Sequence, residues 1–396
     1  MKLDPAAWLD RPGMRLLVDA LDAGLGATRL VGGAVRDLAL GLEVADLDLA
    51  TRLVPTDVIA RLDAVGIKSV PTGLAHGTIT AIASGTVVEI TTLRSDLATD
   101  GRRATVGFTD DWAADAARRD FTINALYADP LTGELFDPAG HGLADLATRH
   151  VRFIGLPLER IAEDHLRILR FFRFHARFAT GAPDAQALAA CTARANDLMA
   201  LSRERIADEL LKLLALPDPL ATVAVMVEHG ILRPVLPEID DTSPLAVLLS
   251  AEQATAIPCD PLRRLAALLP RDALTAEKIG ARLKLSLKAR KRLAQAADPT
   301  DLGTPQAHAY RLGTQSAIDR LLLAGHAADA TALTTWPLPR LPLTGGELIA
   351  RGLPQGPIVA RTLKAIEQQW LDAGFPTGPV FERIATEAIA AATTSR

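Results

Sequence analysis

The sequence predicts an α+β head, with a mixed sheet and helices, followed by an all-α neck, body and tail. Strand-like and helix-like segments alternate over roughly the first 140 residues. From about residue 157 the apolar periodicity is helical nearly to the end. Proline-containing breaks interrupt this helical region at 217–219, 234–237, 298–305 and 337–342. We therefore expect a head over 1–142, a neck over 143–215, a body over 216–330 and a tail over 331–396.

The head is expected to contain several short elements in order. TRLVGG (28–33) and DLDLAT (46–51) read as strands, and residues 55–66 read as a helix with Pro55 near its start. Residues 77–94 read as two strands joined at Ser84–Gly85. Residues 95–111 hold glycines and charges without a clear period, which predicts a mobile loop. A helix over 112–126 and a turn-rich segment over 128–142 complete the head.

Composition limits the classes of protein. The chain has 396 residues and 49% hydrophobic content, enough for two or more globular domains. No uninterrupted apolar run approaches the roughly 18 residues of a membrane span, and the first residues lack a secretory pattern, so we expect a soluble, cytoplasmic protein without a membrane partner. Cys191 and Cys259 do not suggest a disulfide framework or a zinc site. Because the net charge is -4, nucleic-acid contact would depend on local basic surfaces such as 160–178 and 284–293.

Two aspartates stand one residue apart in an apolar run. In a strand, Asp46 and Asp48 would share one face, about 6.6 Å apart at the Cα atoms. Like charges held this close repel unless a cation lies between them, and a hard ion with oxygen ligands, Mg²⁺ above all, satisfies that need. Glu89, on a second predicted strand, could supply a third oxygen. A lone Asp-x-Asp pair is also common as solvated charge at strand ends.

A glycine pair precedes these aspartates. Gly32 and Gly33 end the preceding strand, and without Cβ atoms their backbone can approach a phosphate closely. Arg36 can pair with the same phosphates through its planar fork. A metal-dependent nucleoside triphosphate site is the economical interpretation. The alternative is a strand end with a surface Arg–Asp pair.

A second set of charged residues follows in RIAEDHLRILRFFRFHARF (160–178). On a helix, Asp164, Arg167 and Arg170 would lie on one face. Asp accepts hydrogen bonds and Arg donates them, a combination that suits the pairing edges of cytosine and adenine and rejects guanine and uracil. The alternative is an ordinary salt bridge of Arg167 with Glu163 or Asp164, worth about 0.3–0.5 kcal/mol. The helix taken alone favours this alternative.

Several motifs in order resemble one known family. LVGGAVRDLALG, ADLDLAT, HGTITAI, VVEITTLRSD, RRDFTINAL, LFDPAGHGLADL and RIAEDHLRILRFFRFHARF resemble bacterial class II tRNA nucleotidyltransferases and the related bacterial poly(A) polymerases. The resemblance covers about residues 29 to 178, with weaker similarity through the helical part. It implies a nucleotidyltransferase head and an RNA-binding tail.

The resemblance implies roles for individual residues. Asp46 and Asp48 match the metal-binding and catalytic pair, Glu89 matches the carboxylate behind them, and the cofactor would be Mg²⁺. Residues 95–111 match a loop used in switching from C to A addition. Asp164 and Arg167 match the amino-acid template for the base, which reverses the preference for a salt bridge. The expected nucleotide-binding residues are Gly32, Gly33, Arg36, Asp37, Arg119, Asp120, Asn124, Asp164, Arg167, Arg170 and Arg173.

The implied reaction is attack of a tRNA 3′-hydroxyl on the α-phosphate of CTP or ATP, with pyrophosphate release and construction of CCA. The partners would be ATP, CTP and tRNA, bound at its 3′ end and elbow. An enzyme that adds only A, to complete CCA or to make poly(A), shares the same motifs. A non-catalytic RNA-binding protein would not need paired acids, and a small-molecule nucleotidyltransferase would not need some 250 residues of helical body.

Overall fold

The computed structural model describes residues 2–44, 46–100, 103–301 and 303–394. The chain divides into two compact units: Met1–Ser202 with Glu228–Val235, and Arg203–Val227 with Leu236–Arg396. The four-part division expected from the sequence is finer and remains a prediction. Within the described ranges, every helix is too short or too polar to cross a membrane.

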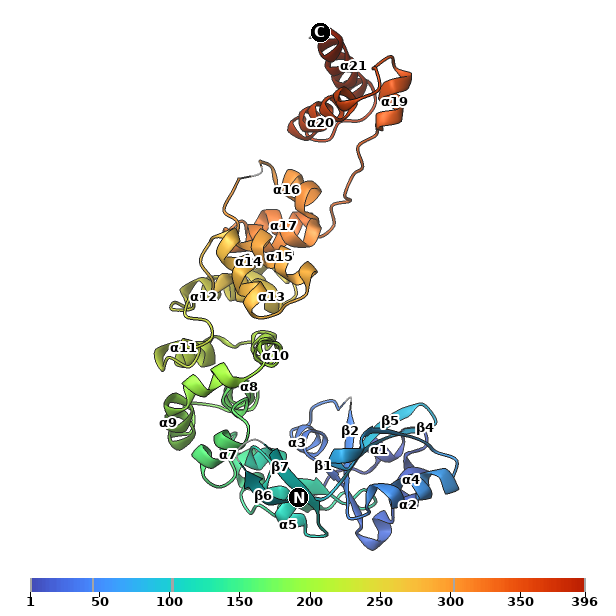
Figure 1. Cartoon of the computed structure of the whole chain (residues 1–396), viewed down its shortest axis with the longest axis vertical. Helices are drawn as coiled ribbons and strands as arrows, with labels where there is room; N and C mark the ends of the chain where they lie inside the picture. The colour runs from blue at the N-terminus through green and yellow to red at the C-terminus, as the bar shows by residue number, and fades with distance from the viewer. Residues whose placement is uncertain (1, 45, 101–102, 302, 395–396) are drawn as a thin grey trace. The chain divides into compact units, whose positions relative to one another are not determined.

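The first unit is built around a mixed sheet, whose strands lie with helices around them in Figure 1. The strand order is β3-β4-β5-β2-β1-β8-β9; β2 and β5 run parallel, and the other neighbouring strands are antiparallel. This confirms the predicted head with a mixed sheet. The strands are β1 (Thr28–Val31), β2 (Leu47–Thr51), β3 (Lys68–Gly73), β4 (Thr78–Ala83), β5 (Thr86–Thr92), β8 (Tyr127–Ala128) and β9 (Leu135–Phe136).

The β4–β5 hairpin follows from its sequence. Alternate residues of β4 are buried, namely Ile79, Ala81 and Ala83, as expected for a strand with one face on a core. Ser84 and Gly85 both have positive φ, 49° and 92°. Two such residues form the tight turn whose twist matches an antiparallel pair. The predicted turn at this position is confirmed.

Helices cover the sheet and carry the chain between its strands. α4 begins at Pro55, as predicted, and packs against β3 and β4, whereas α3 packs against β1 and β2. The helices up to the end of the sheet region are α1 (Ala6–Leu9), α2 (Met14–Ala20), α3 (Gly33–Ala39), α4 (Pro55–Ala64), α5 (Trp112–Ala117) and α6 (Gly142–Ala147). The remaining helices of the unit are α7 (Pro157–Glu163), α8 (Arg167–Phe178) and α9 (Ala185–Ala193).

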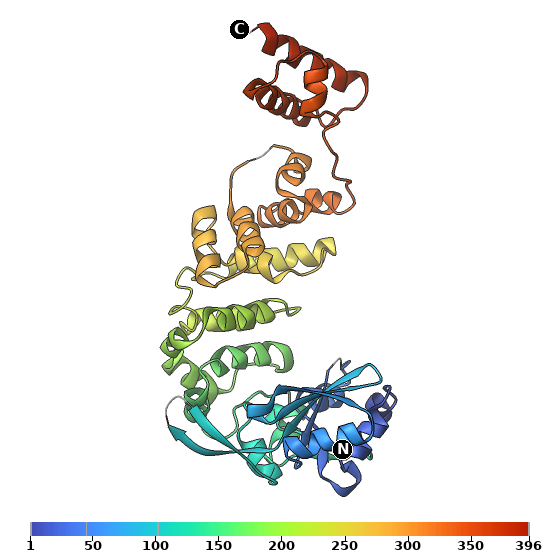
Figure 2. The ribbon, with the colours of Figure 1, turned by 45° about the vertical axis from the view of Figure 1, so that its right-hand side comes forward.

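The segment predicted to be a loop contains a separate hairpin. β6 (Arg94–Asp100) pairs antiparallel with β7 (Arg103–Phe108), apart from the larger sheet (Figure 2). The prediction of a loop was wrong because the charges of this segment hid an ordinary strand pairing. Residues 101 and 102 lie outside the described residues.

The helix predicted over 112–126 is shorter in the structure. α5 ends at Ala117, and Phe121 is extended, with φ −123° and ψ 148°. Phe121 forms an isolated bridge with Phe153, and its ring packs against Phe153, Phe171 and Phe174. The prediction was wrong because this aromatic packing overrides the helical pattern. Because the helix ends early, the segment from Arg118 to Asn124 contributes polar side chains to the lining of a cavity.

The second unit is helical throughout its regular structure. Each proline-containing break predicted from the sequence separates two helices, which confirms these boundaries. The helices are α10 (Arg203–Leu214), α11 (Leu220–Glu228), α12 (Ser243–Thr255), α13 (Pro261–Ala267), α14 (Ala273–Arg282), α15 (Leu287–Ala297), α16 (Pro305–Leu312), α17 (Thr314–Leu323), α18 (Ala327–Leu333), α19 (Gly345–Ala350), α20 (Pro357–Asp372) and α21 (Pro379–Thr394).

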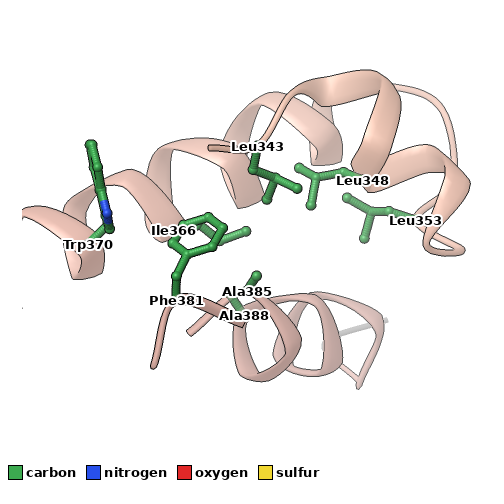
Figure 3. Packing of buried hydrophobic residues seen from close by; sticks show 8 residues of the cluster. All are labelled: Leu343, Leu348, Leu353, Ile366, Trp370, Phe381, Ala385 and Ala388. Carbon is green, nitrogen blue, oxygen red and sulfur yellow. The ribbon is translucent and has the colours of Figure 1, made fainter. Parts of the chain in front are cut away.

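A hydrophobic core and a cluster of buried ion pairs stabilise this unit. At the C-terminal end, apolar side chains from α19, α20 and α21 point toward one another, among them Leu348, Ile366 and Phe381 (Figure 3). Within α12–α17, Arg263 lies between two carboxylates, Glu252 at 2.6 Å and Asp319 at 2.9 Å, with all three side chains almost fully buried. Buried charges persist only when they are paired in this way.

Candidate active site

One cavity of about 510 Å³ collects most of the residues singled out in the sequence. This volume lies in the range of small-molecule sites in proteins. Its charged lining has six arginines and four aspartates. The excess of arginines suits an anionic ligand, and the aspartates can accept hydrogen bonds from donor groups of that ligand. The lining residues are Gly32, Gly33, Arg36, Asp48, Arg94, Asp115, Arg118, Arg119, Asp120, Asn124, Asp164, Arg167, Arg170 and Phe174.

The environment of Asp48 disfavours the ionised form of its carboxylate. Asp48 lies in β2, partly buried, directly beside Glu89 of the parallel strand β5. Burial, followed by the charge of Glu89, raises the pKa of Asp48 from its ordinary value of 3.8 to about 6, although Arg119 opposes the change. The negative charge of Asp46 adds to the increase. A cation beside this carboxylate would stabilise its ionised form and lower the pKa.

The predicted strand placement of the aspartate pair is wrong for Asp46, and the metal-binding role of the pair stays a prediction. Asp46 is exposed and precedes β2, which begins at Leu47, so the two aspartates do not share a regular strand as expected. The donor set nevertheless suits a hard divalent ion, since Asp46, Asp48 and Glu89 offer only carboxylate oxygens. Over the described ranges, no cluster of three or more His, Cys, Asp or Glu side chains stands ready to hold a metal. A metal here would need further oxygens from a ligand.

The glycine pair opens the cavity beside these acids. Gly32 has φ 71° and ψ −128°, a conformation open in practice only to glycine. A Cβ on Gly32 would lie 3.5 Å from Nη1 of Arg119, and one on Gly33 would lie 3.5 Å from Nη2 of Arg36. Without Cβ atoms, the two glycines leave space in the cavity beside the guanidinium groups of Arg119 and Arg36.

A chain of hydrogen bonds runs from this turn to α8. Buried Arg36 donates to Asp37 at 2.7 Å and to the side-chain oxygen of Asn124, and burial lowers the pKa of its guanidinium. Asn124 donates to Asp120 at 2.9 Å. Asp120 in turn accepts two bonds from Arg170, at 2.9 Å and 2.5 Å. The glycine turn and α8 are thus connected by one continuous network.

A further ion pair in the cavity joins Asp115 to Arg119. Asp115 accepts from Arg119 at 2.9 Å, from the hydroxyl of Tyr127 at 2.7 Å and from the backbone N–H of Arg94 at 3.2 Å. Burial would raise the pKa of Asp115, but the charge of Arg119 and these hydrogen bonds hold it below its usual value. The pair is therefore ionised at neutral pH.

Asp164 and Arg167 do not lie on one helix, contrary to the sequence prediction. α7 ends at Glu163, Asp164 is extended, and α8 begins at Arg167. The break arises because Asp164 accepts from the backbone N–H of Leu166 at 3.1 Å, a local bond that competes with helix continuation. Both side chains still line the same cavity.

The salt bridge considered as the alternative is also present. Arg167 pairs with Glu163 at 2.6 Å and donates to the carbonyls of Arg160 and Arg118 at 3.0 Å and 3.1 Å. These bonds use three of the five N–H groups of a guanidinium and fix its plane. The pairing with Glu163 is thus compatible with a further contact to a ligand.

Four predicted residues lie outside the cavity lining: Asp37, Asp46, Glu89 and Arg173. Asp37 pairs with Arg36, and Arg173 lies over the ring of Phe174 with its guanidinium carbon 4.6 Å from the centroid. Sequence reasoning missed Arg94, Asp115, Arg118 and Phe174 as lining residues. Asp115 could have been noticed, since it precedes Arg119 by one helical turn.

Comparison with known families matches two parts of the chain. Residues 28–152 match the model of the poly A polymerase head domain. Residues 182–242 match a model described as a probable RNA and SrmB-binding site of polymerase A.

Similar proteins extend the match over most of the chain. A mitochondrial CCA tRNA nucleotidyltransferase 1 of Danio rerio is 35% identical over 361 residues, covering 86% of this chain and 83% of the relative. A CCA-adding enzyme of Lacticaseibacillus paracasei is 32% identical, covering 87% of this chain and 88% of the relative. The crystal structure of the Bacillus stearothermophilus CCA-adding enzyme with CTP has a TM-score of 0.77 at 23% identity and covers 100% of both chains, a likeness of fold.

Proposed function

Because this chain belongs to the family of CCA tRNA nucleotidyltransferases and poly(A) polymerases, we propose that it adds CCA to tRNA 3′ ends. It uses CTP and ATP without a nucleic-acid template and releases pyrophosphate. The observation that carries this proposal is that Asp48, six arginines and Asp164 line one cavity. The cytoplasmic location expected from the sequence stays a prediction, as the similar proteins include mitochondrial ones.

The triphosphate binds between the glycine turn and the arginines. Gly32 and Gly33 allow the phosphates to approach the backbone, and Arg119 presents Nη1 on the same side. Buried Arg36 supplies positive charge beside Gly33, and its hydrogen bond orients Asn124. A charge in a partly desolvated cavity acts more strongly on a phosphate than the same charge in water.

Asp46 and Asp48 are the residues that hold the divalent ion, which we propose to be Mg²⁺, with Glu89 beside Asp48. When bound, the ion makes the attacking hydroxyl more acidic and neutralises charge on the triphosphate. Asp48 is suited to this role because burial and the charge of Glu89 disfavour its ionised form, and a bound cation would offset both effects. Asp48 lies near the start of β2 and lines the same cavity as Gly32 and Gly33.

Asp164 and Arg167 select the base. The carboxylate accepts the amino group that cytosine and adenine share, and the guanidinium donates to the neighbouring ring nitrogen. Guanine and uracil present a carbonyl and an N–H at these places and would leave both protein groups unsatisfied, a cost of about 1–3 kcal/mol for each. The bonds from Arg167 to Glu163 and to two carbonyls hold the guanidinium for this contact.

Addition of A alone, either to complete CCA or to make poly(A) tails, uses the same residues. A gel assay separates these activities: purified protein is given tRNA ending before CCA, after C or after CC, with each nucleotide in turn. CCA addition predicts C incorporation on the first two substrates, A on the third, and no growth beyond the final A. Incorporation of A on the CC end without C incorporation on the shorter ends would establish A addition that completes CCA, and A on every end would establish poly(A) synthesis. The absence of incorporation would contradict the proposal.

A further inference from the structure

We infer that Asp115 is a positioning residue of the active site: it holds Arg119 in the orientation that receives the triphosphate. Asp115 itself does not touch the substrate in this account. The inference rests on the proposed function, since it specifies how one phosphate-binding arginine of that site is oriented.

Burial and geometry support this assignment. Asp115 is 3% exposed, whereas the side chain of Arg119 is 25% exposed at the cavity. Two nitrogens of Arg119, Nη2 and Nε, donate to one oxygen of Asp115 at 2.9 Å and 3.3 Å. Nη1 is thereby turned toward Gly32, where a Cβ would lie 3.5 Å away. The carboxylate therefore fixes which edge of the guanidinium faces the glycine turn.

Tyr127 completes the clamp. Its hydroxyl donates to the same oxygen of Asp115 at 2.7 Å and accepts from Nε of Arg119 at 3.3 Å. The ring is fully buried and meets Trp112 edge to face, with centroids 5.3 Å apart. Because the hydroxyl is fixed by a buried ring, it cannot follow Arg119 into other orientations.

The other oxygen of Asp115 reaches a second lining residue. It accepts from the backbone N–H of Arg94, where β6 begins. The side chain of Arg94 donates to the carbonyl of His76 at 3.0 Å. An asparagine at position 115 could still accept from this N–H while losing the charge that binds Arg119. The substitution Asp115→Asn therefore keeps the bond to Arg94 and disrupts the bonds of Arg119 and Tyr127 to the other oxygen.

The test measures KM for ATP and kcat with a tRNA ending in CC. We expect Asp115→Asn to raise KM about tenfold with a smaller change in kcat, as a phosphate contact loses its preorganisation. In an Arg119→Ala background, the same substitution is expected to leave KM unchanged, because two residues acting through one contact are not additive. The melting temperature of each variant is measured in parallel.

A matched control is Asp319→Asn in the second unit, which removes a carboxylate that is 1% exposed and pairs with Arg263. We expect it to lower the melting temperature and leave KM unchanged. A wild-type KM for Asp115→Asn, or a rise in KM that persists in the Arg119→Ala background, would overturn the inference. Lack of incorporation by the wild-type protein would instead contradict the proposed function.

A second variant keeps the test decisive if Asp115→Asn does not fold. Tyr127→Phe removes the hydroxyl shared by Asp115 and Arg119 and leaves the ion pair in place. Loss of this single hydrogen bond is expected to raise KM about threefold in the wild-type background and not in Arg119→Ala. An equal KM for Tyr127→Phe and wild type would overturn the inference.

Discussion

Replacing Asp48 with asparagine is expected to stabilise the nucleotide-free protein while abolishing nucleotide incorporation. The wild-type carboxylate is ionised at pH 8 in both folded and unfolded states, but the folded state disfavours this charge. Asparagine has a similar shape and carries no charge. If Asp48 instead stabilised the native structure, the substitution would lower the free energy of unfolding, because loss of a native partner destabilises the fold.

The magnitude follows from the raised pKa. The difference between 3.8 and about 6 corresponds to at most about 3 kcal/mol in the free energy of unfolding above pH 6. Because Asp48 keeps part of its surface in water, we expect about 1–2 kcal/mol. As the pH falls below about 4, the carboxylate is protonated in both states and the difference between wild type and variant disappears.

The assay is urea unfolding of both proteins without divalent ions at pH 4, 6 and 8, together with incorporation measured at pH 8 with magnesium. Asp57→Asn, an exposed acid in the first turn of α4, serves as a control for the loss of one charge. Lower stability of Asp48→Asn at pH 8, or retained incorporation, would refute the reasoning.

Arg167→Ala should lose discrimination between ATP and GTP by about tenfold or more, because the donor to the base is removed. Glu163→Gln, the control, should retain this discrimination. Unchanged selectivity of Arg167→Ala would mean that Arg167 only forms the salt bridge with Glu163 and does not select the base. Gly32→Ala should lower stability by about 1–3 kcal/mol through backbone strain and also raise KM for ATP. Gly26→Ala, at φ 72° in open space, is its control for strain and should leave KM unchanged. Because Asp48 must lose its proton to bind a metal, the magnesium concentration for half-maximal activity should rise about tenfold per pH unit below 6; a constant value would count against Asp48 as a ligand.

Local patterns predicted those parts of the fold that depend on neighbouring residues. The turn at Ser84–Gly85, the start of α4 at Pro55 and the proline breaks of the helical region are encoded within a few residues. The candidate site could be anticipated because glycine, arginine and paired acids are chemically distinctive, and the structure brings many of them to one cavity.

Both helix errors arose where specific side-chain contacts, one distant and one local, overrode the helical pattern. The packing of Phe121 on Phe153 ends a helix that the sequence extends. Asp164 bonds to the backbone of Leu166, which divides one predicted helix into two. The spacing of Asp115 and Arg119 could have indicated their ion pair, but the bonds of Asp115 to Arg94 and Tyr127 could not be predicted locally, since they join residues that are 21 and 12 positions away.

The most direct test of the proposed active site is a crystal structure with Mn²⁺, a non-hydrolysable CTP analogue and tRNA lacking CCA. We predict an anomalous peak for manganese between Asp46 and Asp48, triphosphate oxygens beside Gly33 and Arg119, and the cytosine edge against Asp164 and Arg167. A nucleotide bound elsewhere, with these side chains still directed to their present partners, would contradict the assignment of the site.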